Sequence, residues 1–146
     1  MTYQKFEKVI AEIGKKYNVD IFVYRRGNSL FVSNDVYDIL AEVSCIYSAV
    51  VSTDFLLFPF LNEKLQIDIL NACVQLASTP LGLREEKYIV PLPGLITTDG
   101  EQQYITERDG RWFACRRTEH LTQTWTKGQL HQIPEEYRKY AVEVEE

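Results

Sequence analysis

A short segment between Tyr104 and Arg117 holds the residues of this chain that are best suited to binding chemistry. Its sequence, YITERDGRWFACRR, combines three aromatic side chains with four arginines. Guanidinium groups pair with phosphates and carboxylates, and aromatic rings stack on nucleic acid bases. The segment therefore has two possible interpretations. It is either a surface that binds nucleic acid or a pair of strands whose arginines face water.

The Asp109–Gly110 step within this segment predicts a β-hairpin turn. Asp and Gly tolerate the positive φ angles of a type I′ turn, and apolar residues alternate on both sides of the step. Alternation along the second strand puts Trp112 and Arg116 on one face and Arg111 and Phe113 on the other. Because both faces carry aromatic and basic residues, the pattern does not predict a clean platform for stacking bases.

Two sets of residues follow as candidate binding sites. The carboxylates Glu101, Glu107 and Asp109 are expected to surround one hairpin tip, and a net charge of -5 favours a basic protein partner over nucleic acid. The protein-binding candidates are Asp99, Glu101, Glu107, Asp109 and Trp112. The alternative nucleic-acid-binding candidates are Arg108, Arg111, Arg116 and Arg117.

No segment carries a motif for a reaction. The histidines, His120 and His131, stand in a polar stretch without a paired base, so we expect surface or packing roles for them. The acidic pair Glu85–Glu86 and the acidic carboxy-terminal tail do not supply the converging oxygens that a divalent cation needs. We therefore expect a protein that is not an enzyme and that holds no cofactor and no metal.

The cysteines and the amino-terminal segment bear on the cellular compartment. Cys45, Cys73 and Cys115 are odd in number and have no metal-binding spacing, which predicts reduced, buried thiols. Residues 1–17 carry charges every few positions, unlike a signal peptide, and no later stretch reaches the roughly 20 apolar residues of a membrane span. We expect a cytoplasmic protein without a membrane partner.

The elements that must position these residues form two modules. Apolar spacing predicts helices over 3–17 and 63–78, capped by Thr2 and Asn62. Between them, strands are expected over 20–26, 29–35, 36–44 and 47–54, the first two joined by a turn at Gly27–Asn28. We expect an α-β-β-β-β-α module over 1–79, a linker over 80–87 and a small β-rich module over 88–146. The predicted fold class is α+β, an antiparallel sheet with two helices on one face, followed by the β-rich module with a short terminal helix.

Two stretches of the sequence carry a family resemblance. The run ILNACVQLASTPLGLREEKYIVPLPG resembles a junction in which a helix ends at a TP turn and a charged linker leads to a strand. This junction is found in small accessory proteins of temperate phages and prophages of streptococci and related lactic-acid bacteria. The ending QTWTKGQLHQIPEEYRKYAVEVEE is similar to the carboxy terminus of many of them. The chain departs from their pattern at Pro91 and Pro93, which would confine that segment to a sheet edge or a bulge.

The resemblance implies an accessory protein that acts by binding in the cytoplasm of the bacterial host. Small acidic phage proteins include anti-CRISPR proteins, which block the basic nucleic acid grooves of Cas nucleases such as Cas9. A carboxylate-bearing surface complements such a groove and speeds association. The resulting expectation is an inhibitor of a host nuclease, and the alternative is a phage accessory protein that binds DNA or RNA through the Arg-rich hairpin.

Overall fold

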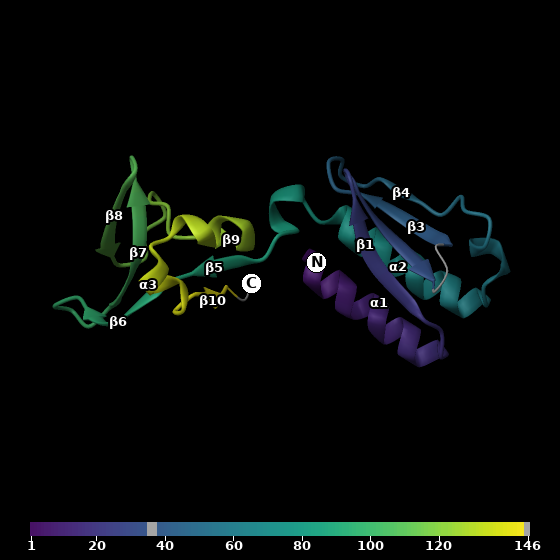
Figure 1. Ribbon diagram of the computed structural model, residues 1–146, viewed down its shortest axis with the longest axis horizontal. Coiled ribbons are helices and arrows are strands. Elements are labelled where there is room, and N and C mark those ends of the chain that lie inside the picture. The colour runs from purple at the N-terminus through teal and green to yellow at the C-terminus, as the bar shows by residue number, and fades with distance from the viewer. Residues whose placement is uncertain (35–37, 145–146) are drawn as a thin grey trace. The chain divides into compact units, whose positions relative to one another are not determined.

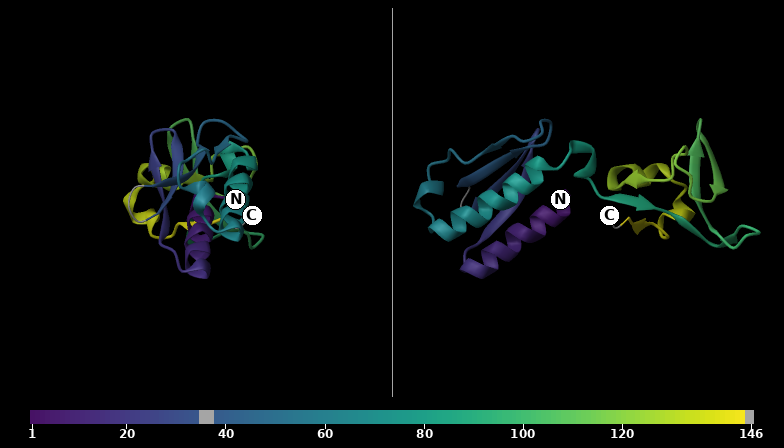
Figure 2. Two further views of the ribbon diagram at one scale, coloured as in Figure 1. Left: turned by 90° about the vertical axis from the view of Figure 1, so that its right-hand side faces the viewer. Right: turned by 180° about the vertical axis from the view of Figure 1, so that it is seen from behind.

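The computed structural model of the protein describes residues 1–34 and 38–144. The chain divides into two units, Met1–Glu85 and Glu86–Glu146, and each unit has a hydrophobic core of its own. The elements of both units are labelled in Figure 1 and seen from two further directions in Figure 2.

The two long helices of the first unit begin at the caps that the sequence predicts. Helix α1 (Tyr3–Tyr17) begins where the Thr2 hydroxyl accepts a hydrogen bond from the backbone N–H of Lys5. Helix α2 (Glu63–Ser78) begins where the Asn62 side chain accepts one from Lys64. Each cap satisfies a backbone donor that has no partner inside its helix.

The sheet of the first unit is antiparallel, with strand order β1-β2-β3-β4. Both helices lie on one face of it (Figure 1). Their buried side chains form the larger core with the sheet. Gly27, with a φ of 59°, makes the tight turn between β1 and β2. The strands are β1 (Ile21–Arg26), β2 (Ser29–Asn34), β3 (Ile39–Ser44) and β4 (Val51–Ser52).

The last of these strands is shorter than the sequence predicts. Residues 45–50 form a turn in which Ala49 adopts a φ of 58°, so regular pairing resumes only at Val51. Strand β3 begins at Ile39, and positions 36 and 37 of the strand expected over 36–44 lie outside the described residues.

The second unit contains two small antiparallel sheets, ordered β10-β5-β9 and β6-β7-β8. Strand β6 is an edge strand with an irregular register between Pro91 and Ile96, in agreement with the expected effect of its prolines. The buried core is formed by Val90, Leu92, Ile105, Trp125 and Ile133. The elements are β5 (Lys87–Ile89), β6 (Pro91–Ile96), β7 (Gln102–Arg108), β8 (Arg111–Cys115), β9 (Trp125–Thr126), a 3₁₀ helix (Lys127–Gln132), α3 (Glu135–Arg138) and β10 (Val142–Glu143).

The expected linker over residues 80–87 is instead structured. Leu81–Leu83 form a 3₁₀ turn, Arg84 is fully buried in the first unit, and Lys87 already belongs to β5. The boundary between the two units, at Glu85–Glu86, falls within this segment.

The α+β fold class is confirmed: an antiparallel sheet carries two helices on one face, and a β-rich unit with a short helix follows. Among the described residues, no helix combines the length and the apolar content that crossing a bilayer requires.

Candidate functional site

The turn between β6 and β7 is held by hydrogen bonds of Thr97. The Thr97 N–H donates to the Glu101 carbonyl at 2.8 Å, and the Thr97 hydroxyl accepts from the Glu101 N–H at 2.9 Å. Gly100, at a φ of 87°, provides a backbone conformation that side chains disfavour. These contacts fix Asp99 and Glu101 at one end of β7.

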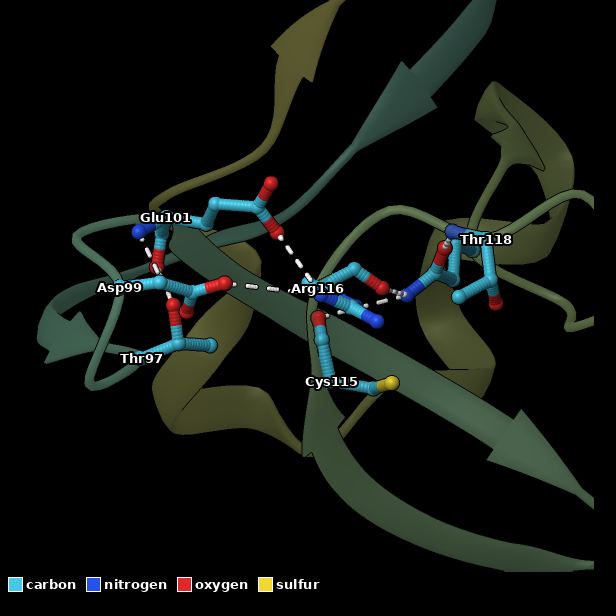
Figure 3. A network of polar contacts seen from close by, with 7 residues as sticks. Thr97, Asp99, Glu101, Cys115, Arg116 and Thr118 are labelled. Carbon is cyan, nitrogen blue, oxygen red and sulfur yellow. Dashed lines mark hydrogen bonds and ion pairs between the residues drawn. The ribbon is translucent and has the colours of Figure 1, made fainter.

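Arg116 follows β8 directly and reaches both of these carboxylates, as Figure 3 shows. Its Nη1 lies 3.6 Å from Oδ2 of Asp99 and 3.6 Å from Oε2 of Glu101. All three side chains are more than half exposed, so solvent screens the attraction. Hydrogen bonding with Thr97, then with its own backbone N–H, and to a smaller extent the charge of Arg116, lower the pKa of Asp99.

Gln123 holds the chain where it leaves β8. Its amide nitrogen donates to the carbonyls of Arg116, at 2.8 Å, and Cys115, at 3.3 Å, and to the hydroxyl of Thr106. Its side-chain oxygen accepts from the Thr118 N–H at 2.8 Å. The side chain is only 3% exposed, so it is a buried support for the position of Arg116. The role of Gln123 was not predictable from the sequence, since a lone Gln in a polar loop carries no signal.

An open hollow of about 500 Å³ lies beside this ion pair. It is lined by Thr97–Asp99 of the turn, by Gln103 of β7 and by Ala114–Arg116. Arg116 balances one of the two carboxylates, so the cluster of Asp99, Glu101 and Arg116 carries one net negative charge. The hollow offers hydroxyl and carboxylate oxygens to a cationic or polar side chain of a partner, and it is too open to exclude water from a reaction.

The other carboxylates lie at the opposite end of β7. At the β7–β8 turn, Asp109 and Gly110 have φ angles of 53° and 76°, as the predicted hairpin turn requires. Glu107 accepts a hydrogen bond from the Gly110 N–H, and Asp109 lies 3.6 Å from Arg108. The expectation that Glu101, Glu107 and Asp109 share one tip is therefore wrong, because β7 separates the first from the other two.

The strand register sorts the arginines onto two faces. Arg108 pairs with Arg111 across the hairpin, and Tyr104 pairs with Cys115, so both pairs lie on one face. Arg117 extends this face, because its guanidinium carbon lies 6.0 Å from the centre of the Tyr104 ring. Phe113, 38% exposed, is on the same face. Arg116 is on the other face, with its carboxylates.

The tryptophans belong to the core of the second unit. Trp125 is 3% exposed, and Trp112 packs half-buried against the same core with 6.1 Å between the two ring centres. Trp112 therefore packs the hairpin against the core of the second unit.

Clustered metal ligands and paired histidines do not occur in the described part of the chain. Within residues 1–34 and 38–144, no group of three or more His, Cys, Asp or Glu side chains is placed to hold a metal ion. His120 and His131 are both exposed, and the ring of His131 contacts the Gly128 carbonyl.

The cysteines differ in burial, contrary to the prediction that all three are buried. Cys73 is fully buried in the larger core, and desolvation raises the pKa of its thiol to about 12. Cys45 and Cys115 are only partly buried. Cys45 directly follows β3, and Cys115 is the last residue of β8.

A second surface, on α2, was not identified from the sequence. Opposite the buried side of this helix, Ile67, Leu70 and Val74 are 50%, 39% and 46% exposed. Spacings of three and four residues align them in one stripe, which we call the α2 stripe. The sequence did contain a signal for this surface, because apolar residues occur on both sides of α2. The core-facing residues alone were enough to predict a helix, so the residues on the other side were not considered.

Comparison with known proteins finds no matching family model, no matching curated protein and no matching solved structure.

Proposed function

We propose that the protein is a non-enzymatic interaction protein that binds another protein. The observation that carries this proposal is the α2 stripe, Ile67, Leu70 and Val74, displayed to solvent on a stable helix. A helix with apolar residues on two opposite sides generally has both sides covered. Aliphatic side chains offer no charge or hydrogen bond to phosphates and base edges, so a protein surface is the complementary partner.

More specifically, we propose that the protein is an anti-CRISPR-type inhibitor that binds a host nuclease. The support is electrostatic: the chain has a net charge of -5, and the described hairpin presents carboxylates at both ends of β7. Such charges speed the approach to a basic groove, while the apolar stripe would contribute the affinity.

The test of protein binding compares two charged variants of α2 as baits in a streptococcal lysate. Leu70→Glu puts a carboxylate in the α2 stripe, and Gln75→Glu puts the same charge at an exposed position outside it. We expect wild type and Gln75→Glu to retain the same partner and Leu70→Glu to lose it, with all three folding equally well. A partner retained equally by Leu70→Glu would remove the α2 stripe from the proposal, and a bait that retains no protein at all would contradict it.

The proposal of nuclease inhibition needs a separate test, because the carboxylates lie at the two opposite ends of β7. The double variants Asp99→Lys/Glu101→Lys and Glu107→Lys/Asp109→Lys reverse charge at one end of β7 at a time. If carboxylates enter a basic groove, one double variant slows association with the captured nuclease and weakens its salt dependence. Unchanged association rates for both double variants would contradict a role of these carboxylates in inhibition, while the proposal of protein binding would stand.

A second candidate function rests on the face that carries Arg108, Arg111 and Arg117 with Phe113 and Tyr104. This face combines positive charge with exposed aromatic surface, as single-strand binders do. Gel-shift titration against single-stranded DNA and RNA at several salt concentrations tests it. If this face binds nucleic acid, changing these three arginines to Ala should abolish the gel shift. Arg116→Ala should leave the gel shift unchanged, because Arg116 lies on the opposite face. Absence of any shift at low salt would exclude this candidate.

A further inference from the structure

Strand β1 forms the outer edge of the first unit's sheet. The strand order is β1-β2-β3-β4, so β1 has β2 on one side and no described strand on the other. All six residues of β1, Ile21–Arg26, stay in continuous register with β2. An edge of this kind presents a row of unpaired backbone groups to a further strand.

Strand β1 differs from most other edge strands of the described chain. Strands β4, β9 and β10 span two residues each, and β6 contains prolines and an irregular register. Strand β8 is regular but one residue shorter than β1. Strand β1 has no proline and no bulge, and its apolar sequence, IFVY, precedes its two arginines. A regular edge strand of this kind is a template for pairing with another chain.

Alternate residues of β1 direct their backbone groups to this open side. The two-residue turn at Gly27–Asn28 makes Arg26 and Ser29 the pair that closes the hairpin ladder. Counting back along the strand, the backbone groups of Ile21, Val23 and Arg25 point outward. These N–H and C=O groups are spaced for an antiparallel partner.

We propose that two copies of the chain pair antiparallel through β1, with Val23 opposite Val23 of the second copy. The sequence around Val23 is complementary to itself: this register puts Asp20 opposite Arg26, and Phe22 opposite Tyr24, twice each. All of these side chains lie on the sheet face away from the helices, since they alternate with the core-facing Val23.

The pairing also continues an aromatic row that is present within one copy. Across the open sheet face, the ring centres of Phe22 and Tyr24 are 6.1 Å apart, and those of Tyr24 and Phe31 are 5.4 Å apart. Phe22 is 44% exposed at the end of this row. In the proposed dimer it contacts Tyr24 of the second copy, so the row crosses the interface and Phe22 is covered.

Helix α1 leaves an open space beside the first residue of β1. An open hollow of about 490 Å³ lies where α1 passes the start of β1, lined by Ala11, Gly14 and Lys15 of the helix and by Asn18–Ile21. The second copy's Arg25, which lies on the helix side of the sheet, would be opposite Ile21 at the edge of this hollow. Helix α2 packs on β3 and β4, so this interface is separate from the α2 stripe and goes beyond the proposed function.

The test is a charge exchange followed by sedimentation velocity over a wide concentration range. Wild type is expected to show a monomer–dimer equilibrium. Asp20→Arg and Arg26→Asp each place like charges opposite one another at two points of the interface, and each should weaken the dimer by on the order of tenfold or more. Mixing the two variants restores both attractive pairs, so they should form a heterodimer. The double variant Asp20→Arg/Arg26→Asp should again dimerise with itself.

Both positions are exposed, so each variant should have the same thermal unfolding midpoint as wild type. This measurement distinguishes a variant that no longer dimerises from one that no longer folds. A wild-type protein that remains monomeric up to millimolar concentration would overturn the proposal. So would a dimer that neither single variant weakens, because it would form through another surface.

Discussion

At the scale of single residues, Arg84 ties together three segments of the first unit. Its side chain is fully buried and donates to the carbonyls of Ser44, Ala77 and Thr79 at 2.6, 2.7 and 2.8 Å. Two of these carbonyls lie at the carboxy-terminal end of α2, where the helix dipole favours a cation, and that of Ala77 also accepts from the Ala49 N–H at 2.8 Å. The guanidinium therefore caps α2 and joins it to the end of β3.

Replacing Arg84 with Met should strongly destabilise the first unit. The change keeps much of the apolar stem but leaves three carbonyls without this donor, and we expect a loss of about 3 kcal/mol or more in the free energy of unfolding. Chemical denaturation measures it. Arg111→Met, at an exposed arginine, is the control and should be close to neutral. Equal stability of the two variants would show that the Arg84 contacts contribute little.

The Cys73 thiol should resist modification in the native protein. Burial raises its pKa to about 12, so the reactive thiolate is scarce at mildly alkaline pH, and the surrounding core also blocks the reagent. A colorimetric thiol assay should show two faster thiols, Cys45 and Cys115, and a slow third. The fast signal should be unchanged in a Cys73→Ala variant, and denaturant should release the third thiol in wild type. Three equal native rates would contradict this burial.

At the scale of elements, the β7–β8 turn depends on two residues with positive φ. Gly110, at 76°, has space around it, so an alanine there meets no steric contact and only the backbone conformation is strained. We expect Gly110→Ala to destabilise the second unit by about 1 kcal/mol. Gly128→Ala is the matched control in the same unit, because Gly128 has no positive φ and an added Cβ meets only an ordinary contact at 3.9 Å. Thermal unfolding compares the two variants. Equal unfolding midpoints would show that the turn does not require a glycine at position 110.

Helices α1 and α2 are joined by a polar contact that responds to pH. Asp68 of α2 accepts from Lys16 at 2.7 Å and from the Tyr17 hydroxyl at 2.8 Å, and these hydrogen bonds, that from Lys16 first, lower the pKa of Asp68. A lowered folded-state pKa means that the contact stabilises the fold above the unfolded-state pKa and that this contribution is lost as the pH falls through the folded-state pKa.

The variant Asp68→Asn should therefore lower the unfolding temperature slightly at neutral pH and match wild type in acid. Thermal melts across a series of buffers measure the difference. Glu12→Gln, on an exposed position of α1, removes a carboxylate elsewhere and should not reproduce this trend. A difference that stays constant down to acid pH would show that charge is not the cause.

At the scale of the whole molecule, the division into two units predicts independent folding. Each unit has its own buried cluster, and that of the second unit is much the smaller. We expect the fragment 1–85 to unfold cooperatively and the fragment 86–146 to be folded but only marginally stable, since small domains bury a smaller fraction of their surface. Circular dichroism melts of both fragments test this. Two unfolded fragments would show that neither core is sufficient.

Local chemistry made several features of this protein predictable. Thr2 and Asn62 cap their helices because short polar side chains satisfy nearby backbone donors, and Asp109–Gly110 makes its turn because few other pairs tolerate those φ angles. Such effects act within a few residues of chain. The amino acid sequence by itself therefore determined the helices, the two tight hairpins and the α+β class.

Contacts between distant residues were decided only by the tertiary structure. Nothing near Arg84 in sequence indicates that it is buried, since its partners are brought together by packing α2 against β3. The same holds for Arg116, which meets Asp99 and Glu101 because the β7–β8 hairpin folds back on the β6–β7 turn. The length of β7 places Glu107 and Asp109 at its other end. Strand register, burial and the choice of exposed faces depend on long-range packing, which local propensities do not encode.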